Sequence, residues 1–163
     1  MNIALRRVLG ILDLGGSFLG FTLGLTSLLQ QTTVAVLIVE IPFLALYCWG
    51  IWCGVQMLEN SPRAVRTNMW FWAMQIPYLM SPIIGYLFTS GAFLFVTYQP
   101  GTSTTSFTAR VGSQFQVSLL QGQSFQIGIN FLALAVCILL MMNKRHLEKG
   151  GVECSRVVAD SNP

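Results

Sequence analysis

The chain has 163 residues, of which 53% are hydrophobic and only 9% are charged. Soluble domains carry roughly a quarter of charged residues, so this composition excludes an ordinary soluble globular protein. The net charge of +3 does not indicate nucleic-acid binding, because the basic residues lie between and beyond long apolar stretches.

Four apolar stretches are predicted to cross a membrane as helices. A membrane-spanning helix needs about 20 mostly apolar residues. The stretches cover residues 8–29, 33–58, 69–98 and 125–142. We therefore predict an all-α membrane protein, a four-transmembrane-helix antiparallel bundle, with one transmembrane domain over residues 1–142.

The first stretch, 8–29, carries an acid and a regular row of glycines. Gly16, Gly20 and Gly24 repeat every four residues, a spacing that lets helix backbones approach closely in lipid. Asp13 precedes Gly16 by three residues and so shares its helical face. Because the run is longer than a signal-peptide core and lacks a small-residue cleavage site, we expect it to be retained.

The second stretch, 33–58, carries the other intramembrane acid, Glu40, on a face shared with Gly50 and Gly54. A charged side chain in hydrocarbon costs about 2.5–3.5 kcal/mol on insertion scales, so such residues are seldom accidental. From the rise per residue, Asp13 and Glu40 lie roughly 12 Å apart in depth, too far to share a proton.

Each acid has an amide at its own predicted depth, Gln75 in the third stretch for Asp13 and Asn130 in the fourth for Glu40. We predict two polar layers, Asp13 with Gln75 and Glu40 with Asn130. They serve either as interhelical hydrogen bonds or as stepping sites of a proton or cation pathway.

The outer loop, residues 99–124, alternates apolar and polar residues with a period of two, which predicts strands. A three-residue turn at 112–114 would pair Val111 with Phe115, Ala109 with Val117 and Phe107 with Leu119. The resulting β-hairpin would have one apolar face, including Phe107, Val111, Phe115 and Val117. That face is expected either to cover the bundle itself or to bind a partner.

The basic residues predict the topology. Arg6 and Arg7 precede the first stretch, Arg63 and Arg66 follow the second, and more basic residues follow the fourth. The positive-inside rule then places the N and C termini in the cytoplasm, with a mobile cytoplasmic tail at 143–163. We expect a multi-pass protein, with the bacterial inner membrane as its location.

No catalytic, cofactor-binding or metal-ligating motif is present, so we expect a non-enzymatic protein without cofactors. The leading hypothesis is a small subunit or accessory partner of another membrane protein, in contact with the lipid bilayer, or a homo-oligomer. The alternative is a small oligomeric proton- or cation-coupled transporter or channel that uses Glu40 and Asp13.

Overall fold

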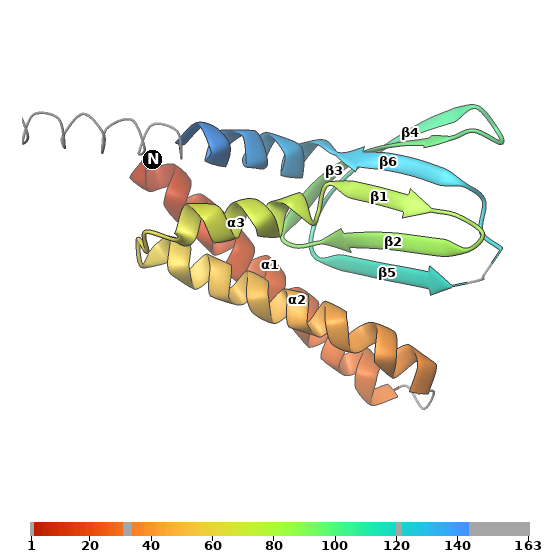
Figure 1. The fold of residues 1–163 in the computed structure, drawn as a ribbon, viewed down its shortest axis with the longest axis horizontal. Coiled ribbons are helices and arrows are strands. Elements are labelled where there is room, and N and C mark those ends of the chain that lie inside the picture. The colour runs from red at the N-terminus through yellow and green to blue at the C-terminus, as the bar shows by residue number, and fades with distance from the viewer. Residues whose placement is uncertain (1, 31–33, 120–121, 144–163) are drawn as a thin grey trace, which may run out of the picture.

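The computed structural model describes residues 2–30, 34–119 and 122–143. Within these ranges the chain forms four helices and one six-stranded antiparallel sheet, so the fold is α+β (Figure 1). The prediction of an all-α bundle of four transmembrane helices is therefore wrong. The predicted tail falls almost entirely on residues 144–163, outside the described part of the chain.

The first two predicted spans are helices, α1 (Ile3–Gln30) and α2 (Val34–Leu58), which lie side by side as an antiparallel pair (Figure 1). Both Ile3–Gln30 and the segment Glu40–Leu58 are long and apolar enough to cross a membrane. That test rests on length and composition alone. The helix Phe131–Asn143, also apolar, is shorter.

The third predicted span divides into a helix and strands. Helix α3 (Ala64–Ala73) ends before Pro77, and three strands follow: β1 (Pro77–Met80), β2 (Ile84–Thr89) and β3 (Ala92–Gln99). Proline lacks the backbone donor that a continuing helix needs. Gly91, between β2 and β3, adopts a positive φ of 88°, which permits the sharp turn there.

The remaining strands are β4 (Thr104–Val111), β5 (Gln114–Leu119) and β6 (Gln126–Asn130). The predicted hairpin is wrong in its pairing, because β4 pairs with β3 and β5 pairs with β2. The sheet order β4-β3-β6-β1-β2-β5 puts these two strands at opposite edges. The fourth predicted span likewise divides, into β6 and the helix Phe131–Asn143.

The main core lies where the helices meet the outer side of β2. Phe88 of β2 is buried against Tyr47 of α2 and Phe71 of α3, with ring centroids 5.1 and 6.0 Å apart. Phe43 stacks on Phe115 of β5 at 5.4 Å. Side chains of the helix Phe131–Asn143 complete this core. The sheet is thus attached to the helices through the outer face of β2 and β5.

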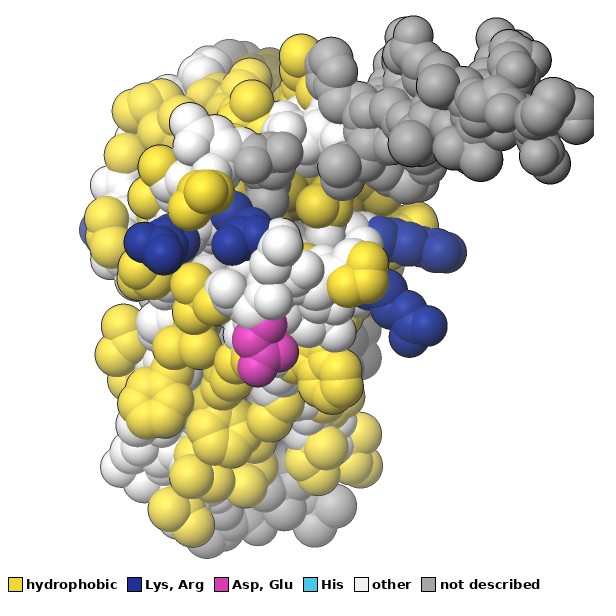
Figure 2. All heavy atoms as spheres, turned by 90° about the vertical axis from the view of Figure 1, so that its left-hand side faces the viewer, with side chains coloured by type: hydrophobic (Ala, Val, Ile, Leu, Met, Phe, Trp, Pro, Cys, Tyr) yellow, Lys and Arg dark blue, Asp and Glu magenta, His cyan; other side chains and the backbone are white. Residues whose placement is uncertain are grey.

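Charged side chains are scarce and segregated. Apart from two buried acids and Arg110, the charged groups of the described residues lie at the start of α1 and around the α2–α3 turn: Arg6, Arg7, Glu59, Arg63 and Arg66. Figure 2 shows arginine side chains at this end of the molecule, with hydrophobic side chains covering most of the face below them.

Candidate functional site

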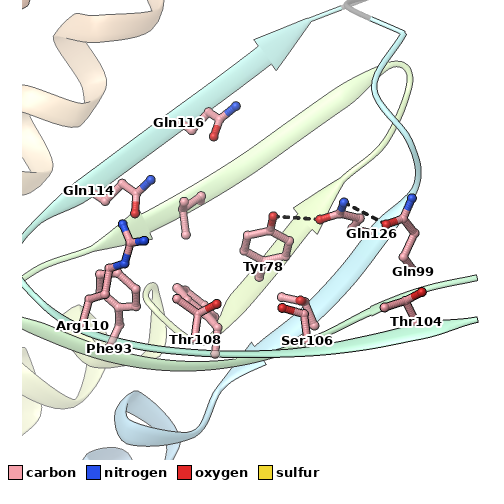
Figure 3. Close-up of a pocket in the computed structure, with 13 residues that line it drawn as sticks. Tyr78, Phe93, Gln99, Thr104, Ser106, Thr108, Arg110, Gln114, Gln116 and Gln126 are labelled. Atoms are coloured by element: carbon pink, nitrogen blue, oxygen red, sulfur yellow. Dashed lines mark hydrogen bonds between the residues drawn. The ribbon is translucent and has the colours of Figure 1, made fainter. Parts of the chain in front are cut away.

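The concave face of the sheet forms a cavity, which we call the cup. It has a volume of about 410 Å³ and is lined by side chains from all six strands. Both edge strands contribute, Arg110 and Thr108 from β4 and Gln114 and Gln116 from β5. The sheet is therefore curved enough that its two edges face each other across the cup, although β4 and β5 do not pair (Figure 3).

The wall of the cup is polar because polar and apolar residues alternate along the edge strands β4 and β5. The polar residues of β4 (Thr104, Ser106, Thr108 and Arg110) line the cup, while Phe107 and Val111 lie exposed on the other face. In β5, Gln114 and Gln116 line the cup and Phe115 packs against the helical core. Alternate residues of a strand point to opposite faces, so the period-two pattern separates the two environments.

The floor of the cup is aromatic. Phe93 and Phe95 are buried in a small cluster of their own, with ring centroids 5.3 Å apart, and Tyr78 lies 5.3 Å from Phe95. The Tyr78 hydroxyl donates to Gln126 Oε1 at 3.1 Å, and Gln126 Nε2 donates to Gln99 Oε1 at 3.3 Å (Figure 3). Burial raises the pKa of the Tyr78 phenol, so it remains a donor at neutral pH.

Among the described residues, Arg110 is the only charged one that lines the cup. Figure 3 shows its guanidinium pointing toward Gln114 of the opposite edge strand. Within residues 2–30, 34–119 and 122–143 it makes no ion pair and no side-chain hydrogen bond. The cup thus has a positive group that the described chain leaves unneutralised.

Asp13, the first acid singled out from the sequence, is fully buried between helices. Its carboxylate lies near the Trp72 indole and Cys53. Among the described residues, neither carboxylate oxygen has a hydrogen-bond partner of ordinary geometry, and neither has the Trp72 Nε1. This is an unsatisfied buried polar group, which normally costs about 1–3 kcal/mol.

Gln75 is buried but does not bond Asp13. Its Oε1 accepts from the Ser90 amide at 2.8 Å, and the Ser90 hydroxyl shares a 2.8 Å hydrogen bond with Ser17. Ser17 lies one helical turn beyond Asp13 in α1. The structure therefore brings Gln75 and Asp13 into one buried polar region without the direct pair that the predicted layer requires.

The second predicted layer does not form a bond either. Glu40 is buried, and its Oε2 has no partner within the described residues. Asn130 Oδ1 instead accepts from the amides of Leu94 at 3.1 Å and Ala133 at 3.3 Å. Asn130 thus joins β3 to the start of the helix Phe131–Asn143, a structural role at a strand–helix junction.

The five glycines predicted to pack helices all lie at close contacts: Gly16, Gly20, Gly24, Gly50 and Gly54. A Cβ on Gly16 would lie 2.1 Å from the Gly91 backbone nitrogen, so α1 meets the β2–β3 turn there. Gly20 faces the Tyr47 ring, and Gly24 faces Leu44. Gly50 and Gly54 would meet α1 at Ser17 and Leu14.

The four residues proposed for partner binding separate into two pairs. Phe107 and Val111 are 67% and 87% exposed on the outer face of β4. Phe115 and Val117 of β5 are half-buried and pack against the helical core. One half of the predicted apolar face therefore covers the chain's own helices, and the other half is exposed.

The sequence reasoning missed the cup. Its polar residues lie in the predicted outer loop (Gln99, Thr104, Ser106, Thr108, Arg110, Gln114 and Gln116) and in the predicted fourth span (Gln126). The available signal was the run of Gln, Ser and Thr at alternate positions. Only the sheet order, which joins segments distant in sequence, turns that run into one cavity.

Comparison with family models, with curated proteins and with solved structures gives no match for this chain. Among the described residues, no three His, Cys, Asp or Glu side chains lie together so as to hold a metal ion.

Proposed function

We propose that this chain is a non-enzymatic integral membrane protein that acts as an accessory partner of another membrane protein. Its distribution of polarity supports the membrane part of the proposal. The apolar outer face of the sheet is exposed at Tyr98, Phe107, Val111, Ile127 and Ile129, while the cup has a polar wall around an aromatic floor. This is the reverse of a soluble sheet, which buries its apolar face.

The helices continue the same apolar exterior. Large side chains such as Ile11 and Phe18 of α1 and Ile38 and Ile41 of α2 are exposed, although these helices pack against each other. Exposed apolar surface of this extent indicates contact with lipid or with another protein. The basic side chains at the start of α1 and around the α2–α3 turn then lie on the cytoplasmic side.

The accessory role rests on one observation, the exposed edge strand β4. Seven of its eight residues are exposed, and it pairs on one side only, with β3. An unpaired edge presents a row of backbone N–H and C=O groups, and soluble proteins protect such edges with lysine, proline or a bulge. The sequence of β4, TTSFTARV, has neither lysine nor proline, and its one charged residue, Arg110, lines the cup.

Lipid makes an uncovered edge still less favourable. In hydrocarbon, backbone polar groups without partners cost several kcal/mol each, so open sheet edges are not found facing lipid. A partner strand or helix against β4 would cover these groups and also bury Phe107 and Val111. We therefore place the partner-binding surface on β4.

The test is co-purification from native membranes in mild detergent. We expect the double substitution Phe107→Ser and Val111→Ser to abolish recovery of the partner while the chain stays inserted. Phe115→Ser is unsuitable, because this ring packs in the helical core. The matched control is Phe18→Ser with Ile41→Ser, two exposed positions on α1 and α2 away from β4.

The proposal is contradicted if the double variant recovers the same proteins as the unmodified chain. Recovery of the chain alone, in complexes of defined size, would assign the β4 edge to self-association instead of an accessory role.

A second candidate, proton- or cation-coupled transport, is favoured by the polar groups between the cup and Asp13. Thr89 Oγ1 donates to the Gln114 carbonyl at 3.2 Å, and its neighbour Ser90 bonds Ser17 and Gln75. We call the buried residues Thr89, Ser90, Ser17 and Gln75 the polar string; Ser17 lies one helical turn from Asp13, and no hydrogen bond joins Thr89 to Ser90 among the described residues. Intramembrane acids beside such strings mark ion pathways in many proteins.

The transport candidate is tested by proton uptake into proteoliposomes, followed with a trapped pH-sensitive dye. We expect Asp13→Asn to abolish uptake and Glu40→Gln to leave it, because the polar string leads to Asp13 only. Equal uptake by the unmodified chain, the Asp13 variant and empty liposomes would reject this candidate.

A further inference from the structure

We propose that the cup is a binding site for an anionic, hydroxyl-rich group, a small polyol that carries one phosphate or carboxylate. Arg110 would hold the charged end, and the glutamine side chains of the wall would bind the hydroxyls. The accessory role uses another part of β4, its unpaired edge with the outward side chains Phe107 and Val111.

The first argument is the number of free polar groups in the wall. The side chains of Gln114, Gln116, Ser106 and Thr108 line the cup and make no hydrogen bond with other described residues. Each amide offers two donors and an acceptor, and each hydroxyl offers a donor and an acceptor. A ligand with several hydroxyl groups is the chemical match for such a mixed set.

The second argument is the charge. Of the described side chains that line the cup, Arg110 alone is charged at neutral pH, and none is a carboxylate. A guanidinium binds phosphate or carboxylate through two parallel hydrogen bonds, which gives both strength and orientation. The same positive charge disfavours a cationic ligand, so the site selects for an anion.

The third argument is shape. A volume of about 410 Å³ lies within the range of small-molecule sites and suits one ligand of monosaccharide size. The floor supplies the apolar part of such a site through Phe93, Phe95 and Tyr78. Aromatic faces can receive the C–H side of a polyol while its hydroxyls reach the wall.

Two sources of this ligand fit the same chemistry, a lipid headgroup and a free solute. The cup lies beside an exposed apolar surface, and the edges β4 and β5 on either side of it are not paired with each other. A lipid headgroup could occupy the cup while its acyl chains remain against that surface. A free polyol phosphate would enter from water.

The experiment compares the two sources with the full chain in phosphatidylcholine nanodiscs. Binding of glycerol 3-phosphate is measured by calorimetry, with uncharged glycerol as the matched ligand. In a second arm, the melting temperature is measured in nanodiscs with and without phosphatidylglycerol, whose headgroup has the same chemistry. We expect a response in at least one arm and no response to glycerol.

The deciding variant is Arg110→Gln, with Arg63→Gln as the matched control at the opposite, basic end of the molecule. Loss of the charge-assisted bonds should weaken binding about ten- to a hundredfold, or remove the lipid-dependent rise in melting temperature. Arg63→Gln should behave as the unmodified chain. Gln116→Ala is a second cup variant, with a smaller loss expected.

Response to glycerol 3-phosphate assigns the site to a soluble ligand, and response to phosphatidylglycerol alone assigns it to lipid. No response in either arm, or an equal response in the Arg110 variant, overturns the proposal. The Phe107 and Val111 double variant should bind the probe normally, so a failure of the accessory role is distinguishable from a failure of this site.

Discussion

Buried carboxylates without partners are uncommon, and Asp13 is one of them in this chain. Its two oxygens face the interior of the helix pair, where Trp72 and Cys53 are neighbours but no hydrogen bond of ordinary geometry forms. A buried polar group in this state destabilises the fold unless it has a function that retains it. Substitution of Asp13 therefore tests whether this residue is retained for a function or for the stability of the fold.

We expect Asp13→Ala to leave the free energy of unfolding unchanged or to raise it by about 1–3 kcal/mol, because it removes an unsatisfied acceptor. Gln75→Ala is the matched control. It should lower the free energy of unfolding, since Gln75 accepts the Ser90 amide at 2.8 Å. The stability of both variants is measured by thermal unfolding of the detergent-solubilised protein. A marked loss of stability in the Asp13 variant would show that the carboxylate has a structural partner.

Neighbouring glycines in α1 give a second residue-scale prediction. A Cβ on Gly16 would lie 2.1 Å from the Gly91 nitrogen, whereas one on Gly15 would meet nothing within 4 Å. We expect Gly16→Ala to cost about 1–3 kcal/mol through overpacking. Gly15→Ala should cost nothing, since alanine favours helix over glycine. Equal thermal stability of the two variants would contradict the contact between α1 and the β2–β3 turn.

At the scale of elements, the sheet should differ in stability from its centre to its edges. Strands β6 and β1 pair on both sides, while β4 pairs only with β3. Hydrogen exchange follows local opening, which is easiest at unprotected edges. In the purified chain we expect amides of β4 to exchange faster than those of β1 and β6. Slow exchange throughout β4 would show that the edge is covered without a partner.

Two matching pentapeptides show which elements the sequence could predict. Residues 40–44 read EIPFL and residues 75–79 read QIPYL, yet the first lies inside α2 and the second enters β1. Apolar composition alone does not distinguish helix from strand. Helices α1 and α2 were predictable because their runs are long and little interrupted. The third run carries Pro77, Pro82 and Gly91, and these divide it into strands.

The strands β4 and β5 were predictable from their alternation, but their pairing was not. A hairpin with the three-residue turn would place the apolar residues of both strands on one face. The observed pairs Ala92↔Val111 and Phe88↔Phe115 do the same within the sheet, so the alternation does not distinguish the two pairings. The pairing of β4 with β3 and of β5 with β2 can be predicted only if residues 84–99 are recognised as strands. Because the apolar run 69–98 predicts a helix, the sequence predicts neither the cup nor the position of Arg110 within it.

At the scale of the whole molecule, the sheet has an apolar outer face and a concave face whose polar wall surrounds an aromatic floor. The outer face either packs on α1 and α2 or is exposed at residues such as Phe107 and Ile129. The charged end formed by Arg6, Arg7, Arg63 and Arg66 lies apart from the cup. Both proposals depend on this arrangement, because it places the outer face against lipid or protein and the cup in contact with water.

The most direct measurement is labelling of single cysteines in intact cells with a membrane-impermeant maleimide, after the four native cysteines are replaced by serine. We expect Ser106→Cys in the cup to react from outside and Ile129→Cys on the outer face not to react. Ser61→Cys, in the α2–α3 turn, should react only in inverted vesicles. Rapid labelling of Ile129→Cys together with protection of Ser106→Cys would contradict the inside-out arrangement of the sheet.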